Sequence, residues 1–169
     1  MSRLQGEQAG KERGANQVEI IKPEEYAVSE WAGGKTTQLY IYPQDSEYAK
    51  RNFLLRISSA TVECERSEFT SLPQVERIIL PLSGSLHLFY EGHGEKKLEQ
   101  DRFDGGWKTV SVGRATDFNV MLREGTQAQV RLLDVNPNEQ ASVEVAANGL
   151  TAVFAAQGTA VVDGKALPE

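Results

Sequence analysis

The sequence has few of the residues from which disulfides, metal centres and membrane spans are built. It contains one cysteine, Cys64, so no disulfide can form within the chain, which suits a reducing cytoplasm. The two histidines, His87 and His93, would lie roughly 20 Å apart on an extended strand, although a bend at Gly92 would bring them closer. No window approaches the ~18 consecutive apolar residues of a membrane span. The sequence therefore predicts no metal site, no cofactor and no membrane partner.

The charge and the first residues narrow the choice of compartment and partner. Twenty-four acidic against 18 basic residues give a net charge of -6, which disfavours nucleic acid and anionic membrane as main partners. Residues 1–17 lack an apolar core, an apolar period and a signal cleavage site. They predict a flexible tail on a cytoplasmic protein, followed by one domain over residues 18–169.

The remainder of the chain alternates with a period of two and is interrupted by turn residues every 8 to 12 positions, as expected for a β-sandwich or barrel. Helix is scarce, with one short turn predicted inside residues 43–53. The chain is therefore predicted to be all-β, with very little helix. Strands are expected within residues 18–21, 36–43, 53–64, 75–82, 85–91, 97–103, 108–112, 113–125, 128–135, 142–146, 150–156 and 159–164.

One of these strands places an arginine in an apolar setting. In FLLRISSATV, residues 53–62, both faces are apolar at the start, which predicts a central strand covered on both sides. Arg56 and Ser58 share one face, and an arginine is almost never fully buried unless it is paired. Either Arg56 reaches solvent or a structural ion pair, or its planar fork binds a ligand carboxylate.

A second strand carries an acid and an amide on one face. In ATDFNVML, residues 115–122, Phe118, Val120 and Leu122 point one way, whereas Asp117 and Asn119 point the other. The polar pair either faces water or lines a pocket. An inward Arg-x-Ser on one strand and an Asp-x-Asn on another complement each other, and this favours one polar pocket inside the barrel.

The other motifs give weaker indications of function. AGGKTT ends like a phosphate loop, but Ser29 stands where the first glycine is required and the next residues continue as a strand. We reject nucleotide binding, and Gly33-Gly34 predicts a tight turn instead. Cys64 has no histidine close in sequence and no nucleophile elbow is present, so no catalytic residue is predicted. Arg77 lies at a strand start and is compatible with a simple surface charge.

Several of these segments together resemble the HutD/Ves family. They are WAGGKTTQLYIYP, LLRISSATV, FTSLPQVERIILPLSG, FDGG and DFNVM, in that order, and the resemblance covers roughly residues 18–135. The chain departs from the family where Leu72-Pro73-Gln74 replaces the usual Phe-Pro-Gly before Glu76-Arg77. This departure bears on the Arg77 loop and on any shared ligand specificity.

The resemblance implies a cupin-like β-barrel with two cupin-like halves in one chain, in the cytoplasm of a bacterium. For the HutD branch it implies a regulatory role in histidine utilisation, which does not follow for the Ves branch. It implies a non-catalytic protein that binds a small carboxylate metabolite such as formylglutamate. The implied ligand-binding residues are Trp31, Thr36, Thr37, Arg56, Ser58, Arg77, Asp117 and Asn119.

Two other functions stay open on the sequence alone. The barrel could be a cupin-type enzyme acting on a small polar substrate, or a purely structural or interaction protein. A homodimer also stays open.

Overall fold

The computed structural model describes residues 18–145 and 149–167, which confirm the predicted all-β class with very little helix. The tail predicted for residues 1–17 lies outside the described residues. Among those described, no helix has the length and apolar character needed to cross a membrane. The elements are η1 (Pro23–Glu25), β1 (Ala27–Trp31), β2 (Gly34–Tyr42), η2 (Tyr48–Lys50), β3 (Leu55–Val62), β4 (Arg66–Glu68), β5 (Glu76–Gly84), β6 (His87–Tyr90), β7 (Gly94–Lys97), β8 (Asp101–Asp104), β9 (Thr109–Val112), β10 (Ala115–Leu122), β11 (Val161–Val162) and β12 (Lys165–Ala166).

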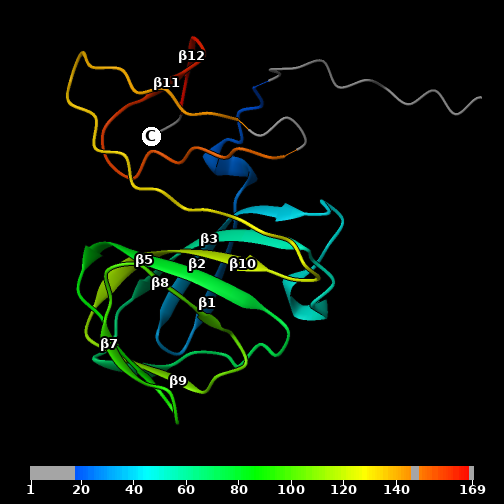
Figure 1. Ribbon diagram of the computed structural model, residues 1–169, viewed down its shortest axis with the longest axis vertical. Helices are drawn as coiled ribbons and strands as arrows, with labels where there is room; N and C mark the ends of the chain where they lie inside the picture. Colours follow the sequence, from blue (N-terminus) through cyan, green and yellow to red (C-terminus); the bar gives the residue numbers. More distant parts are fainter. Residues whose placement is uncertain (1–17, 146–148, 168–169) are drawn as a thin grey trace, which may run out of the picture.

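Two antiparallel sheets pack face to face (Figure 1). The larger has the order β1-β2-β3-β10-β5-β8, and the smaller has the order β4-β9-β6-β7. Because side chains alternate along each strand, every strand of the larger sheet sends one set inward, toward the smaller sheet, and the other set outward. β3 and β10 are central in the larger sheet, as the sequence of β3 predicts.

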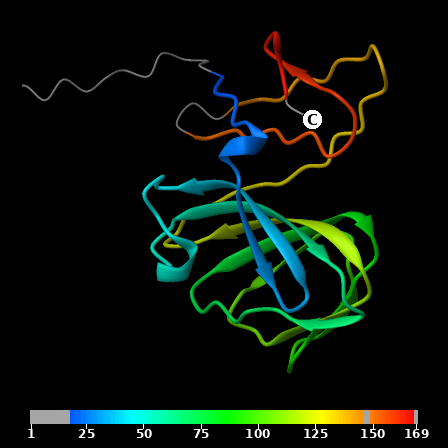
Figure 2. The ribbon, with the colours of Figure 1, turned by 180° about the vertical axis from the view of Figure 1, so that it is seen from behind.

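The larger sheet is covered on both faces, which explains its two sets of apolar residues. The outward set includes Ile57, Ile78, Val120 and Leu122, all less than 10 % exposed. Ala128 and Val130 of the C-terminal segment (residues 123–145 and 149–167) pack on this outward set. Figure 2 shows the C-terminal segment on the side of the larger sheet that faces away from the smaller sheet. The inward apolar clusters contain Phe53, Val62, Leu72, Val75, Ile79, Leu86, Leu88, Tyr90, Leu98, Phe103, Ala115 and Met121.

The strands predicted within residues 128–135, 142–145 and 150–156 are wrong, and so is the one predicted at 18–21. Alternation states which side chains share a face, but a strand forms only where a partner strand supplies backbone hydrogen bonds. The C-terminal segment crosses the outer face of the sheet instead of extending its edge, and it leaves Leu132 71 % exposed. Among residues 123–145 and 149–167, only β11 and β12 pair, in a two-stranded sheet. The second cupin-like half stays a prediction.

The hairpin between β1 and β2 depends on Gly34. As the sequence predicts, Gly33 and Gly34 form a tight turn into a strand. Gly34 has a φ of +151°, and a Cβ placed there would lie 1.8 Å from the carbonyl oxygen of Thr61. No side chain fits at that distance from a neighbouring backbone.

Replacing Gly34 with alanine is expected to lower the free energy of unfolding by roughly 2–3 kcal/mol, since both the positive φ and the contact oppose a Cβ. Urea denaturation followed by tryptophan fluorescence measures this change. Gly92→Ala is the matched control, because Gly92 also has a positive φ (+76°) but has open space around it. An equal loss in the two variants would contradict the contribution of the Thr61 contact.

Candidate binding site inside the sheets

The inward face of the larger sheet carries polar residues in adjacent rows. Residues that stand opposite each other on antiparallel strands share a face. In one row, Met121 of β10 stands between Arg56 of β3 and Arg77 of β5. In the next row, Asn119 stands beside Ser58. In the third, Asp117 stands beside Ala60. Strand register thus places six of the eight predicted residues on one inward face, namely Thr36, Arg56, Ser58, Arg77, Asp117 and Asn119.

Arg56 is buried, with 4 % of its surface exposed, and its head group is held on several sides. Its Nε donates to Oε1 of Gln38 at 2.8 Å, and an Nη donates to the Ser58 hydroxyl at 3.3 Å. The guanidinium carbon lies 4.2 Å from the centre of the Tyr48 ring, a cation–π contact. Burial lowers the pKa of Arg56 from 12.5 to about 10, so the side chain stays charged at neutral pH. It pairs with neutral groups, and no ion pair to it is found in the described part of the chain.

Arg77 is buried too, with 6 % exposed, so the reading of this residue as a simple surface charge is wrong. Its guanidinium carbon lies 4.7 Å from the centre of the Phe69 ring and 5.4 Å from that of Phe103. Its Nε is buried and has no hydrogen-bond partner among the residues that the structure describes. Burial lowers the pKa of Arg77, and the charge of Asp117 acts in the opposite direction. The residue therefore keeps an unused donor in the interior.

Asp117 and Asn119 are 2 % and 4 % exposed, and each has a buried Oδ1 that accepts no hydrogen bond from the described part of the chain. Burial raises the pKa of Asp117 to about 7, although Arg77 acts to lower it. The charged group that acts on Asp117 is thus Arg77, from the neighbouring strand β5. Because buried polar atoms almost always have partners, three unpartnered atoms on one face, counting Nε of Arg77, indicate a place where a ligand would bind.

Trp31, Thr36 and Thr37, which the resemblance also implies as ligand-binding residues, do not all lie at this cluster. Thr36 stands opposite Ala60 and is half-buried, so it shares the row of Asp117. Thr37 stands opposite Ser59 and therefore belongs to the outward set. Trp31 pairs with Gly34, which in turn stands opposite Val62, at the far end of β3 from Arg56. Its ring packs on the inward apolar cluster, and its buried Nε1 has no partner.

Comparison with known proteins shows which family the chain belongs to. The family model HutD matches residues 23–168. The chain belongs to the HutD family. No match was found among curated proteins.

Two solved structures show the same fold as this HutD-family chain. A conserved protein of unknown function from Pseudomonas aeruginosa PAO1 is 23% identical, with a TM-score of 0.55 over 63% of this chain. HutD from Pseudomonas fluorescens SBW25 is 22% identical, with a TM-score of 0.51 over 60% of this chain. In both cases the match spans 58% of the other chain. At these identities the likeness shows the cupin-like fold alone.

Sequence reasoning on this HutD-family chain missed three residues that hold Arg56. Gln38 shares its row with Ser58, and alternation from Thr36 along the same strand could have found it. Met121 places its sulfur 3.9 Å from an Arg56 nitrogen, but an apolar residue there reads as core. Tyr48 comes from η2, outside the sheet, and no sequence pattern ties that helix to β3.

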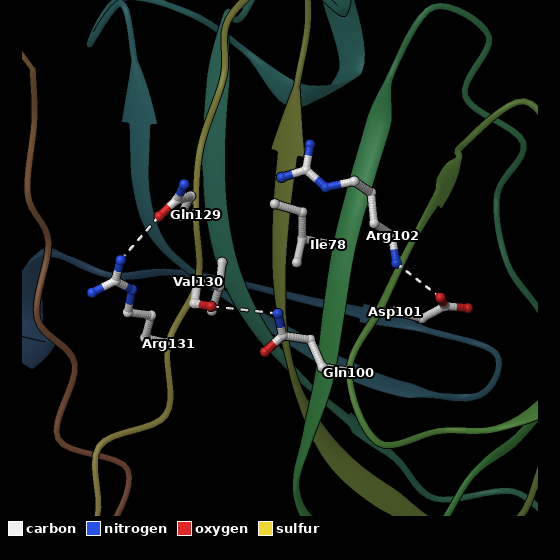
Figure 3. Close-up of a pocket in the computed structure, with 7 residues that line it drawn as sticks. All are labelled: Ile78, Gln100, Asp101, Arg102, Gln129, Val130 and Arg131. Carbon is white, nitrogen blue, oxygen red and sulfur yellow. Dashed lines mark hydrogen bonds between the residues drawn. The ribbon is translucent and has the colours of Figure 1, made fainter.

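The surface hollows of this HutD-family chain lie elsewhere. One, of about 290 Å³, lies where the C-terminal segment crosses the edge of the larger sheet, and Figure 3 shows Gln100 directed toward the Val130 carbonyl there. Another, of about 380 Å³, surrounds the β1–β2 turn and includes Trp31 and Cys64. Neither is lined by the inward polar residues, so the candidate site is the buried cluster and not an open groove.

The two histidines do not meet. His87 lies 3.8 Å from Glu95 and stacks on Phe89, whereas His93 stacks on Trp107 with ring centres 3.9 Å apart. Within residues 18–145 and 149–167, no group of three or more His, Cys, Asp or Glu side chains is placed to hold a metal ion.

Proposed function

We propose that this HutD-family chain is a non-catalytic protein that binds a small carboxylate metabolite and regulates histidine utilisation, with formylglutamate as the candidate ligand. The observation that supports it is the buried polar cluster, in which Arg77, Asp117 and Asn119 each keep an unpartnered polar atom beside the charged Arg56. A carboxylate is the natural partner for two buried guanidinium groups, because their paired N–H donors match its two oxygens. The proposal includes a cytoplasmic location, and it excludes nucleic acid and membrane as partners.

The proposed contacts follow the geometry. Arg56 binds the ligand carboxylate with the donors that Gln38 and Ser58 leave free, and Asn119 orients the ligand from the neighbouring row. Both arginine head groups are buried, so entry requires movement of covering side chains. Tyr48, which lies over the Arg56 guanidinium and is itself half-buried, is the side chain that must move first.

Calorimetric titration of the protein with formylglutamate, glutamate and urocanate tests the ligand class. Formylglutamate is expected to bind, and Asn119→Ala is expected to weaken it about 5- to 30-fold, the effect of one hydrogen bond at a buried site. Asn136→Ala is the matched control, because Asn136 lies in an exposed turn and should leave affinity unchanged. Equal affinity in wild type and Asn119→Ala would contradict the role of Asn119, and no binding by any of the three compounds would contradict the proposal.

One observation favours a second function, that of a cupin-type enzyme acting on a small polar substrate. A carboxyl group whose pKa lies near 7 is suited to general acid–base catalysis, and Asp117 has this property inside the cluster. Proton NMR of protein mixed with a tenfold excess of formylglutamate separates the two functions. A binding protein leaves the compound unchanged over hours, whereas an enzyme converts it.

A further inference from the structure

The charges of the buried cluster do not cancel. Arg56 and Arg77 each carry a positive charge at neutral pH, because a guanidinium group is not deprotonated in proteins, and Asp117 carries at most one negative charge. With Asp117 ionised, the unliganded cluster holds one positive charge in excess. With Asp117 protonated, it holds two. Buried charge without a partner is costly, so the occupant that fits best brings the sum closest to zero.

This condition links the charge of the ligand to the state of Asp117. A monoanion neutralises the cluster when Asp117 is ionised. A dianion neutralises it when Asp117 is protonated. The second arrangement also gives partners to more of the buried groups, because each arginine then has an anionic partner and Asp117 becomes a hydrogen-bond donor to the ligand. Arg77 acts to lower the pKa of Asp117, and a ligand anion bound at Arg77 competes with Asp117 for that positive charge.

We infer that this cluster binds a dianion, such as a dicarboxylate, together with one proton that Asp117 takes up. The inference rests on the proposed function and specifies its ligand class and its pH dependence. Its structural basis is the position of Asp117, buried on the same inward face as both arginines, with an Oδ1 that no donor in the described residues satisfies.

The groups around the cluster leave Asp117 as the one that titrates. Arg77 on β5 acts on Asp117 directly, and Arg56 on β3 shares the face. Tyr48 of η2 and Tyr90 of β6 act on the arginines, and Tyr90 donates to Asp101 at 2.8 Å. Burial raises the pKa of Tyr90, so it stays neutral, and the arginines stay charged. Only the carboxyl of Asp117, with a pKa of about 7, changes state near neutral pH.

Calorimetric titration with glutarate at pH 8, in Tris and in HEPES, measures the number of protons that the protein takes up on binding. The two buffers have different ionisation enthalpies, so the difference in observed heat gives the number of protons taken up. Close to one proton is expected with glutarate, because Asp117 is about nine-tenths ionised at pH 8. Affinity is expected to fall about tenfold between pH 8 and pH 9. Butyrate, a monoanion of similar size, should bind with no proton uptake.

The Asp117→Asn variant checks the assignment. Asparagine mimics the protonated acid in shape and charge, so this variant should bind glutarate with no proton uptake and with the same affinity at pH 7 and pH 9. If the variant does not fold, carbon-13 NMR of the Asp117 carboxyl in wild type decides, since bound glutarate should raise its pKa well above 8.

The outcomes separate the two claims. Glutarate that binds at pH 8 without taking up a proton, or butyrate that takes one up, would overturn this inference and leave the proposed function standing. Absence of binding by glutarate, butyrate and formylglutamate at both pH 6 and pH 8 would overturn both.

Discussion

Replacing Asp117 with asparagine is expected to raise the free energy of unfolding of the unliganded protein by about 4 kcal/mol more at pH 8 than at pH 4. In the folded protein the pKa of Asp117 is about 7, whereas its ordinary value is 3.8. The folded state therefore binds the proton more tightly than the unfolded state. Between pH 4 and pH 7 the wild-type protein loses stability as this carboxyl ionises inside the sheets, at roughly 1.4 kcal/mol for each pH unit. Asparagine cannot ionise and avoids this loss.

Urea denaturation of both proteins at pH 4, 6 and 8 measures the difference. Taking the variant minus wild type removes the contributions of all other titrating groups, such as Asp101, whose pKa is lowered. Asp134→Asn is the matched control, since it makes the same substitution at an exposed position outside the cluster. A constant difference for Asp117→Asn would show that this carboxyl ionises in the folded protein as it does in water.

The second large effect is expected at Arg56. Removing its guanidinium in Arg56→Ala should weaken the binding of formylglutamate by roughly 2–5 kcal/mol, because the ligand carboxylate would be buried without its partner. The affinity of Arg56→Lys for formylglutamate should lie between those of wild type and Arg56→Ala, since lysine keeps the charge but cannot offer paired donors. Titration calorimetry of wild type and both variants gives the three affinities.

Arg66→Ala provides the comparison for Arg56→Ala. Arg66 is an exposed residue of β4, outside the cluster, so its removal should leave affinity unchanged. Each variant's urea denaturation curve shows whether the protein is folded under the titration conditions. Full affinity in a folded Arg56→Ala would place the carboxylate elsewhere.

The sequence was most informative where alternation coincided with pairing. In β3 and β10 the two side-chain sets have different chemistry, so the period of two groups Arg56 with Ser58 and Asp117 with Asn119, and strand pairing then puts the two pairs on one face. It could not tell which set faces the smaller sheet. The apolar set of β10, Phe118 to Leu122, packs outward, and the polar set faces in. That choice depends on the C-terminal segment, which supplies the outer cover.

The remaining site residues depend on register and on loops. Arg77 joins the cluster because β5 pairs with β10 so that it stands opposite Met121, a fact of pairing that no single strand contains. Gln38 depends in the same way on the pairing of β2 with β3. Tyr48 depends on the path of the chain between β2 and β3. The C-terminal strands failed for the opposite reason, since an alternating pattern was present there without a partner.

The pairing of β10 with two neighbours ties folding accuracy to ligand recognition in this family member. Asp117, Asn119 and Met121 alternate with Phe118, Val120 and Leu122, so sliding β10 by one residue would exchange the two sets. In the displaced strand, three hydrocarbon side chains would lie between the arginines. The carboxylate of Asp117 would lie in the outer apolar layer. Both exchanges are unfavourable, so the polar set that we propose as a ligand-binding site also disfavours the misaligned sheet. A protein with its strands out of step would therefore lose stability and recognition in a single event.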